Sequence, residues 1–431
     1  MVLGGLILMM LTGLPVAFAF MLVNLVAAVI IVSFGPGLRQ LIFSMESSIT
    51  SFTLVPIPMF ILMGEVMFQS GIAIKVLDVL DKWMGRLPGR LSLLAIGAGT
   101  LFSTLSGSTL ANTAMLGTVL APDMKKRGYS KALSLGPIMG GGGLAMIIPP
   151  SALAVILGSI AQISVAQLLV AGIIPGLILA VTYAIYIIGR CTLQPGNAPS
   201  YEVQITSIAD KFKGLLKYVI PLGAILFLVL GLIFLGIATP SESAALGALG
   251  SIILVTAYGR MGRDVITKSL VSTAQITVML FMIVVGATLF SQLLAYSGAT
   301  RGLVQFVLGK SLPTIVVIIF MQLILLFLGT FMEQVCMMMV TLPLYIPIVT
   351  ALHIDPIWFG LMMLINLEVG LLTPPFGLIL FVMKGVASGD VTMGDIYRAA
   401  FPFVICDLLV IAMILALPQL ATWLPRLMLT N

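Results

Sequence analysis

Two apolar stretches of this chain are interrupted by a proline pair, and they lie about 225 residues apart. The first is GGGGLAMIIPPS at 140–151, and the second is NLEVGLLTPPFG at 366–377. Glycine frees the backbone and a proline pair cannot continue an ordinary helix, so each stretch predicts a break inside a helix. In lipid, a broken helix is tolerated only where it is buried in protein or lines a watery cavity. Paired interruptions in the two halves of a membrane protein therefore indicate a transporter's binding site.

The composition places the chain in a lipid bilayer. It is 60% hydrophobic and only 8% charged, and apolar runs of about 20 residues, long enough to span, recur from end to end. An outer-membrane barrel would instead show alternating segments of about 10 residues, so we expect an all-α polytopic membrane protein. The net charge of +6 indicates cytoplasmic loops and no nucleic-acid partner. Three widely spaced cysteines make neither a disulfide framework nor a metal cluster.

The chain divides into two similar halves around a polar connector at 191–217, which the positive-inside rule assigns to the cytoplasm. Sliding one half on the other by 222 to 225 positions brings Gly107-Ser108 onto Gly329-Thr330, and one proline pair onto the other. Each half then has a hairpin, at 91–124 and 312–350, followed by a helix broken at the proline pair. The hairpin arms are about 17 residues long, at the short end of what can span, so we expect re-entrant hairpins.

Loop charges predict that the two halves have opposite orientations. Six basic residues flank the first hairpin, whereas the second is flanked by Lys310, His353 and Asp355. This favours a cytoplasmic base for the first hairpin and a periplasmic base for the second, which is an inverted repeat. The alternative is a chance similarity between two apolar segments that contain glycine and proline.

We expect five parts along the chain. They are scaffold helices with an interfacial arm at 1–90, a first transport unit at 91–190, the connector at 191–217, second-half scaffold helices with an arm at 218–311, and a second transport unit at 312–431. The N-terminal stretch 2–34 is too long for a signal peptide, lacks a basic start, and should break near Gly13-Leu14-Pro15. Amphipathic segments at 71–90 and 260–269 are expected along the interface, and the whole chain should have about ten spans plus the two hairpins.

The richest polar cluster in an apolar segment runs from 101 to 113 and reads LFSTLSGSTLANT. Hydroxyls, an amide and a backbone opened by glycine supply neutral oxygens and N–H groups together. Unwound carbonyl groups can replace the hydration shell of Na⁺, while helix N-termini attract a carboxylate. The alternative is that the small residues only let helices pack closely.

Carboxylates in apolar segments are candidates for function because they are expensive there. Glu333, in the second hairpin tip, could balance Na⁺ or be protonated, or it could be a structural partner of an arginine or a backbone amide. Glu368 has the same alternatives. Glu242 is expected to cap a helix. Asp407 could pair with Lys384 or with Arg398. No role is assigned to Lys384 or to Asp407.

At these residues the chain resembles the large, M-type membrane subunit of tripartite ATP-independent periplasmic (TRAP) transporters. The resemblance covers nearly the whole chain. Its motifs are SGS at 106–108, APDMKKRGY at 121–129, IPPS at 148–151, AGIIPG at 171–176 and GLLTPPFG at 370–377. Asn112 and Glu333 depart from residues common in the family, a small or hydroxyl residue and an aspartate, which puts the identity of the substrate in doubt.

The resemblance implies Na⁺-coupled uptake of an organic acid, such as sialic acid or a C4-dicarboxylate, by an elevator mechanism in the bacterial inner membrane. It also implies two partners, a small four-helix membrane subunit and a periplasmic substrate-binding protein. Combined with the residues above, it predicts three sets of site residues. The substrate set is Gly107, Ser108, Thr109 and Asn112; the Na⁺ set is Ser103, Ser106, Pro149, Gly329, Thr330, Glu333, Gly370 and Thr373; the hinges are Gly143, Pro150, Pro374 and Pro375.

Two other classes of function remain as alternatives. A stand-alone carrier driven by Na⁺ or H⁺ would have the same architecture and need no binding protein. An intramembrane hydrolase would use Ser106 or Ser108 as nucleophile, but the only histidine, His353, is expected in a distant structural loop and no His-Glu-x-x-His motif exists.

Overall fold

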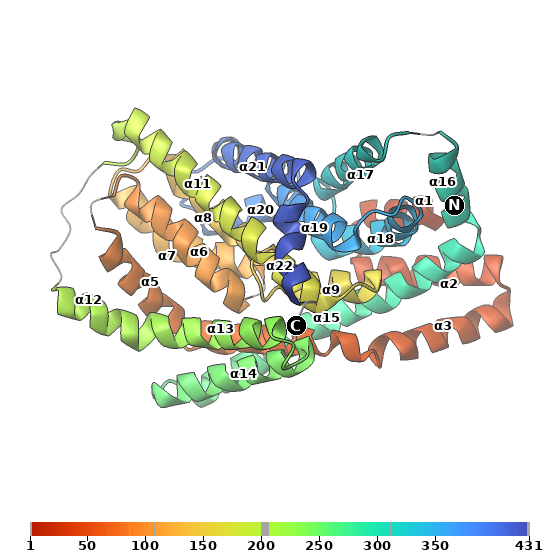
Figure 1. Ribbon diagram of the computed structural model, residues 1–431, viewed down its shortest axis with the longest axis horizontal. Coiled ribbons are helices and arrows are strands. Elements are labelled where there is room, and N and C mark those ends of the chain that lie inside the picture. The colour runs from red at the N-terminus through yellow and green to blue at the C-terminus, as the bar shows by residue number, and fades with distance from the viewer. Residues whose placement is uncertain (1, 86, 107, 200–206, 311, 429–431) are drawn as a thin grey trace.

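A computed structural model of the chain describes residues 2–85, 87–106, 108–199, 207–310 and 312–428, without the side chains of 3, 10, 11 and 103–106. Every regular element in these ranges is a helix, as the apolar composition predicts (Figure 1). The helices of the first half are α1 (Val2–Leu11), α2 (Val16–Ile31), α3 (Phe34–Ile49), α4 (Pro56–Gln69), α5 (Ile72–Met84), α6 (Arg90–Ser106), α7 (Thr109–Lys126), α8 (Lys131–Gly143), α9 (Ala152–Ala161), α10 (Val165–Ala171) and α11 (Ile173–Leu193).

The second half repeats this order of elements. Its helices are α12 (Ile208–Gly214), α13 (Ile220–Phe234), α14 (Pro240–Ala257), α15 (Arg263–Tyr296), α16 (Ala299–Gly309), α17 (Thr314–Gly329), α18 (Gln334–Ala351), α19 (Pro356–Leu372), α20 (Leu378–Val386), α21 (Met393–Ala416) and α22 (Gln419–Met428). Both expected hairpins are present, as α6–α7 and α17–α18. Both expected breaks are present as well, between α8 and α9 and between α19 and α20. The Pro149-Pro150 and Pro374-Pro375 peptide bonds are both cis.

Seven helices in the described ranges are long and apolar enough to cross a membrane. They are Phe52–Gln69, Val165–Leu193, Ile208–Phe234, Pro240–Ala257, Arg263–Tyr296, Gln334–Ala351 and Met393–Ala416. Five shorter apolar helices accompany them, among them Arg90–Phe102 and Thr314–Gly329 in the hairpins. The chain is therefore a multi-pass membrane protein, and the N-terminal stretch breaks at Gly13–Pro15 as predicted, because α1 ends at Leu11 and α2 begins at Val16.

One expected amphipathic segment is not a helix of its own. Residues 260–269 do not form a separate interfacial helix, because from Arg263 they are the first turns of the 34-residue helix α15. No glycine or proline follows within 264–285 to end that helix. The counterpart of α5 in the second half is instead α16, and both helices begin after a glycine in the left-handed conformation, Gly71 and Gly298.

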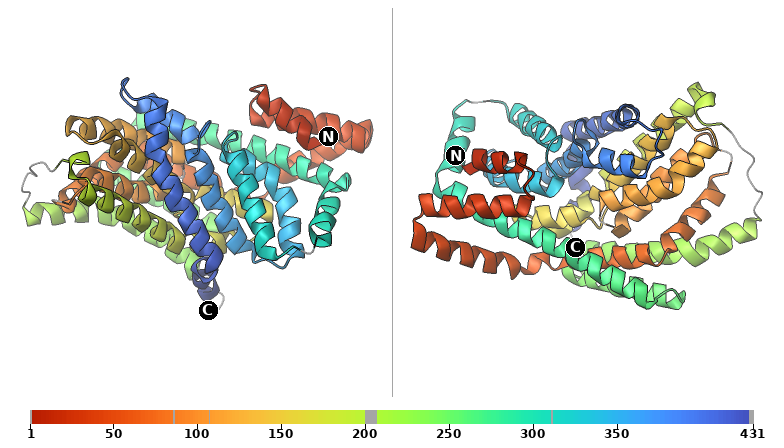
Figure 2. Two further views of the ribbon diagram at one scale, coloured as in Figure 1. Left: turned by 90° about the horizontal axis from the view of Figure 1, so that it is seen from above. Right: turned by 180° about the vertical axis from the view of Figure 1, so that it is seen from behind.

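The helices form two layers. In Figure 1, α12–α14 and α3 run along the lower edge, while α6, α8, α11, α17 and α21 lie above them; the view from behind in Figure 2 shows the same division. In the lower layer α4 packs against α14 and α15, and α15 packs against α2 and α3. In the upper layer α8 packs against α6, α7 and α21, and α19 packs against α17 and α21. Each hairpin thus packs on the helix that precedes the break in its own half.

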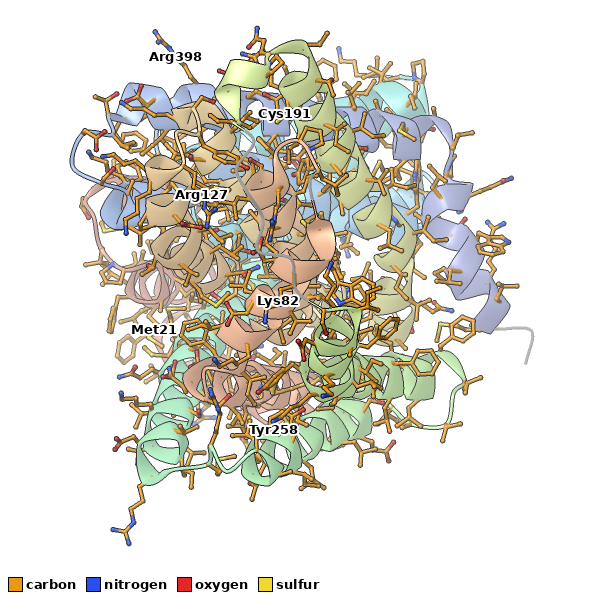
Figure 3. The ribbon with its side chains drawn as sticks, turned by 90° about the vertical axis from the view of Figure 1, so that its left-hand side faces the viewer. Met21, Lys82, Arg127, Cys191, Tyr258 and Arg398 are labelled. Atoms are coloured by element: carbon orange, nitrogen blue, oxygen red, sulfur yellow. The ribbon has the colours of Figure 1, made fainter. Side chains whose placement is uncertain are left out.

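One end of the molecule is basic. Figure 3 views this end, with Lys82, Arg127 and Arg398 labelled. Here Lys125 of α7 pairs with Asp390 in the loop between α20 and α21 at 2.5 Å, and Lys131 of α8 pairs with Asp395 in the first turn of α21 at 2.7 Å. Hydrogen bonds from Lys125 and Ser388 lower the pKa of Asp390 to about 2. We call this region the basic end.

Candidate functional site

The first hairpin tip has two buried hydroxyl groups near the start of α7. Thr109 and Thr113 lie one turn apart on the same face of the helix and are 1% and 0% exposed. Neither Oγ1 atom has a hydrogen-bond partner among the residues that the structure describes. A buried polar atom without a partner costs about 1–3 kcal/mol, so both hydroxyls are available to a ligand or to water. Sequence reasoning selected Thr109 and did not select Thr113, although both belong to the polar run at 101–113.

The other expected substrate residues hold the tip in shape. Ser108 is the N-cap of α7, and its side chain accepts a hydrogen bond from the N–H of Ala111 at 3.4 Å. Asn112 is buried and donates from Nδ2 to the carbonyl oxygen of Gly99 at 3.3 Å, which ties α7 to α6. Gly107 lies outside the described residues. Ser103 and Ser106 lie on α6, but their side chains are outside the described part.

The glycine run at the end of α8 forms the wall behind this tip. The hydroxyl of Thr113 lies against Gly142, where a Cβ would overlap Oγ1, and a Cβ at Gly141 would lie 2.6 Å from the carbonyl oxygen of Ala95. Only glycine permits so close an approach of backbones. Gly143, an expected hinge, has a helical φ of −64° and lies against the carboxylate of Glu368. In this helical conformation, the absence of a side chain at Gly143 allows Glu368 to pack closely against α8.

The first helix break is buried. Every residue from Gly140 to Leu157 is buried, including Pro149 and Pro150. Ser151 is the N-cap of α9, and its side chain accepts the N–H of Ala154 at 3.3 Å. The break therefore ends one helix and starts the next inside the protein, as expected for irregular backbone at membrane depth.

The second hairpin tip packs directly on α19. A Cβ at Gly329 would lie 2.6 Å from the Cα of Gly370, so the two backbones touch at these glycines. Thr330 donates from Oγ1 to the carbonyl oxygen of Phe327 at 2.7 Å. Glu333 is the N-cap of α18, and Oε2 accepts the N–H groups of Val335 at 2.9 Å and Cys336 at 3.3 Å. The structure gives Glu333 a structural role, as a partner of backbone amides.

The second break differs from the first because it is exposed. Pro374, Pro375 and Phe376 are exposed, whereas Thr373 is half-buried and donates from Oγ1 to the carbonyl oxygen of Val369 at 2.6 Å. The backbone N–H of Thr373 donates a hydrogen bond to the carbonyl oxygen of Gly370 at 3.2 Å. The ring of Phe331 in the tip lies 5.8 Å from that of Phe376. The second tip and the second break thus meet at a surface.

An amide pair that sequence reasoning did not select holds α19 on α17. Asn366 donates from Nδ2 to the carbonyl oxygen of Gln322 at 2.7 Å and to its side-chain Oε1 at 2.8 Å. Both residues are buried, at 2% and 8% exposure. This pair ties α19 to α17 in the second half, as Asn112 ties α7 to α6 in the first half. The signal was available, because an amide in an apolar run needs a partner.

The two halves meet where α8 crosses α19. Glu368 on α19 lies against Gly143 on α8, and its Oε1 is 3.4 Å from the hydroxyl of Tyr183 on α11. The same hydroxyl is hydrogen-bonded to Oδ1 of Asp407 on α21. The expectation that Asp407 pairs with Lys384 or Arg398 is therefore wrong. Lys384 instead donates to the carbonyl oxygen of Val391.

A cavity of about 360 Å³ opens between the two layers. It lies between α3 and α15 on one side and α9 and α18 on the other, and none of the expected site residues lines it. Its polar lining is neutral and consists of Ser47, Ser48, Ser51, Ser159, Gln162, Thr288, Ser291 and Gln292. The polar part of this cavity's lining thus carries no charge.

Comparisons with known proteins agree with this arrangement. The DctM component family of the tripartite ATP-independent periplasmic transporters matches residues 3–420. The chain is 32% identical over 408 residues to the C4-dicarboxylate TRAP transporter large permease protein DctM of Pseudomonas aeruginosa, covering 94% of this chain and 93% of that one. It is 31% identical over 424 residues to the sialic acid TRAP transporter large permease protein SiaM of Vibrio cholerae, covering 97% and 96%.

The fold also resembles that of a solved transporter. The YdaH transporter of Alcanivorax borkumensis superposes with a TM-score of 0.64 at 16% identity, over 88% of each chain. At this identity the likeness concerns the fold alone. The two named relatives are transporters and not enzymes, which removes the hydrolase alternative. The chain belongs to the DctM component family of tripartite ATP-independent periplasmic transporters.

Proposed function

We propose that this chain is the permease subunit that carries an organic acid, a carboxylate, across the bacterial inner membrane, driven by a Na⁺ gradient. The observation that supports this most is the pair of buried hydroxyls, Thr109 and Thr113, with no partner in the described part of the chain. They lie in the first turns of α7, where the helix dipole favours an anion. Relatives of this chain are named for C4-dicarboxylate and for sialic acid, and both are acids.

In this proposal the substrate carboxylate binds at the first hairpin tip. Thr109 and Thr113 would donate their hydroxyl protons, and Gly107 and Ser108 would bring the backbone of the tip close to the ligand. Asn112 would position this surface, because it already ties α7 to α6 through Gly99. A tip without a charged side chain lets the carboxylate bind through hydrogen bonds alone.

Na⁺ would bind at positions beside the two tips. The first would take oxygens around Ser103, Ser106 and Pro149, and the second would take oxygens around Gly329, Thr330 and Thr373, where α17 and α19 end. Glu333 supplies negative charge to the second site from its position as the N-cap of α18. Gly370 supports this site by letting α17 approach closely, and we assign it no ion, because its carbonyl oxygen accepts the N–H of Thr373.

Movement would follow the division into two layers. The two units at 91–190 and 312–431 would slide as one body against the scaffold at 1–90 and 218–311, with 191–217 as a cytoplasmic connector. The hairpins would be re-entrant and the repeats inverted. Gly143, Pro150, Pro374 and Pro375 would act as hinges at the breaks. The cavity between the layers suits such sliding, because its polar lining carries no charge that must be paired again at each step.

The basic end would face the cytoplasm, by the positive-inside rule. The connector joins this end, because Asn197 accepts the N–H of Ser130 at 2.8 Å. Since the family is described as tripartite, we propose two partners, a small four-helix membrane subunit and a periplasmic substrate-binding protein.

Reconstitution in lipid vesicles tests this function. The chain, the small subunit and the binding protein would be assembled, a Na⁺ gradient imposed, and the uptake of labelled acids measured. We expect uptake that needs both the binding protein and Na⁺. Unchanged uptake without the binding protein would favour a stand-alone carrier, and unchanged uptake with K⁺ in place of Na⁺ would refute the coupling.

A further inference from the structure

Three side chains from three helices meet at the point where the two halves cross. They are Tyr183 on α11, Glu368 on α19 and Asp407 on α21, and all three are 0% exposed. We call them the buried triad. Gly143 closes one side, because a Cβ there would overlap the carboxylate of Glu368. The buried triad therefore joins the helices that precede both breaks, α8 and α19, to α11 and α21.

The contacts of the buried triad favour an additional proton. The hydroxyl of Tyr183 contacts Oε1 of Glu368 and Oδ1 of Asp407, yet a tyrosine hydroxyl has only one proton to donate. An ionised carboxylate can only accept. If both acids were ionised, one of the two contacts would set lone pair against lone pair. A proton on one acid removes this conflict, since that acid donates to Tyr183 and Tyr183 donates to the other.

No positive charge replaces that proton. The ion pairs among the described residues involve other carboxylates, those of Asp81, Asp123, Asp390 and Asp395. The helices packed against the buried triad have these other titratable groups: Arg90 on α6, Lys131 on α8, Tyr186, Arg190 and Cys191 on α11, Cys336 and Tyr345 on α18, Lys384 on α20, Asp395, Tyr397, Arg398 and Cys406 on α21, and Arg426 on α22.

Of these basic groups, Arg90 and Lys131 are paired at the ends of their helices, and Lys384 donates to a backbone carbonyl. Arg190 lies seven residues from Tyr183 along α11, a rise of about 10 Å, and Arg398 lies nine residues from Asp407, about 13 Å. Arg426 lines a separate cavity together with His353 and Asp355. An isolated carboxylate in such a place is neutralised rather than left charged.

A proton fits this site better than a metal ion does. The described residues contain no group of three or more His, Cys, Asp and Glu side chains that could hold a metal. The hydroxyl of Tyr183 already occupies the position between the two carboxyls. Glu368 Oε2 and Asp407 Oδ2 are buried without a partner in the described part of the chain. A proton on either acid lowers the cost of burying these oxygens without needing more space.

We propose that the buried triad is a proton-binding site, in which Glu368 and Asp407 share one proton through Tyr183. The bound proton keeps α8, α11, α19 and α21 together where the two broken helices cross. Loss of the proton at alkaline pH leaves two buried negative charges side by side, which loosens this junction. The proposal is independent of Na⁺ coupling and of the identity of the acid.

Infrared spectroscopy of the purified chain in lipid nanodiscs tests the proton directly. The spectrum of the Glu368→Gln/Asp407→Asn double variant is subtracted from that of the wild type at about pH 8, where an ordinary carboxyl is ionised. We expect a carboxylic-acid C=O band that belongs to the wild type, shifts in D₂O, and moves to another frequency in Tyr183→Phe. A wild-type spectrum with only carboxylate bands at these positions would overturn the proposal.

Thermal unfolding gives a second measurement that needs neither substrate nor Na⁺. The wild type should lose Tm between about pH 6 and about pH 9, because its folded state alone keeps the proton. The double variant, which is neutral at all pH values, should lose less. Glu46→Gln, which changes an exposed carboxyl on α3, is the matched control and should keep the wild-type profile. If the double variant does not fold, Glu368→Gln is measured instead; it leaves a single acid with no second charge beside it and should also lose less Tm, and a profile equal to that of the wild type would contradict the site.

Discussion

The contact between Gly329 and Gly370 gives the sharpest prediction about the second site. In Gly329→Ala, the new Cβ would lie 2.6 Å from the Cα of Gly370, where ordinary van der Waals contact begins at 3.4 Å. This neighbour is a backbone atom, which cannot rotate away, so α17 and α19 must separate by several tenths of an ångström. Overpacking of this kind costs about 1–3 kcal/mol. Separation would also displace the carbonyl groups at the end of α17, and so weaken Na⁺ binding.

Gly385→Ala is the matched control for this change. Gly385 lies inside helix α20, and a Cβ there would meet nothing within 4 Å. Alanine in an open helical position stabilises by up to about 1 kcal/mol. We therefore expect Tm in detergent to fall for Gly329→Ala and to stay or rise for Gly385→Ala, and the Na⁺ concentration for half-maximal uptake to rise only in the first. Equal Tm shifts of the same sign in the two variants would refute the reasoning.

Three further predictions follow from other residues. Thr109→Val and Thr113→Val should leave the free energy of unfolding unchanged or raise it by up to about 1–3 kcal/mol, because each removes a buried hydroxyl that has no partner among the described residues. Each should nevertheless raise KM about 10- to 100-fold, because a hydrogen bond to a charged carboxylate is lost; a KM unchanged in both would remove the substrate site. Asn366→Leu should destabilise by about 1–3 kcal/mol in unfolding experiments, because it leaves the buried Gln322 without its partner, and a wild-type Tm would show that the pair contributes nothing. Because the pKa of Asp390 is lowered, its ion pair with Lys125 is complete above the ordinary aspartate pKa of about 3.9 and is lost only as the pH falls toward about 2. Plots of Tm against pH for Asp390→Asn and for the wild type should therefore be parallel above about pH 5. Plots that diverge in this range would contradict the assignment.

Strong local signals allowed much of the fold to be predicted. Proline pairs and glycines at matched intervals predicted the hairpins α6–α7 and α17–α18 and the two breaks, because these residues restrict the backbone wherever they occur. The interfacial arm of the second half was misassigned to 260–269. An amphipathic pattern at 260–269 is equally typical of an interfacial helix and of the first turns of a long helix. Only the absence of a following glycine or proline that would end the helix distinguishes these two structures.

The site was predicted in part, for a different reason. The polar run at 101–113 identified the first tip, but the spacing of Thr109 and Thr113 on one face of α7 needed the helix phase. Asp407 was expected to meet a basic residue, whereas its partner Tyr183 lies 224 positions away in the chain. Contacts of that sequence separation depend on how α11, α19 and α21 pack, and no local pattern in the chain encodes them.

The central claim is that Na⁺ and the acid stabilise the same state of one site. The most direct test is to measure the apparent Na⁺ affinity of the reconstituted complex at low and at saturating acid, and the apparent acid affinity at low and at saturating Na⁺. Linkage requires that each ligand change the other's equilibrium affinity by the same factor, typically about 5- to 150-fold. We predict equal factors within that range. A Na⁺ affinity that does not change with the acid would contradict the account.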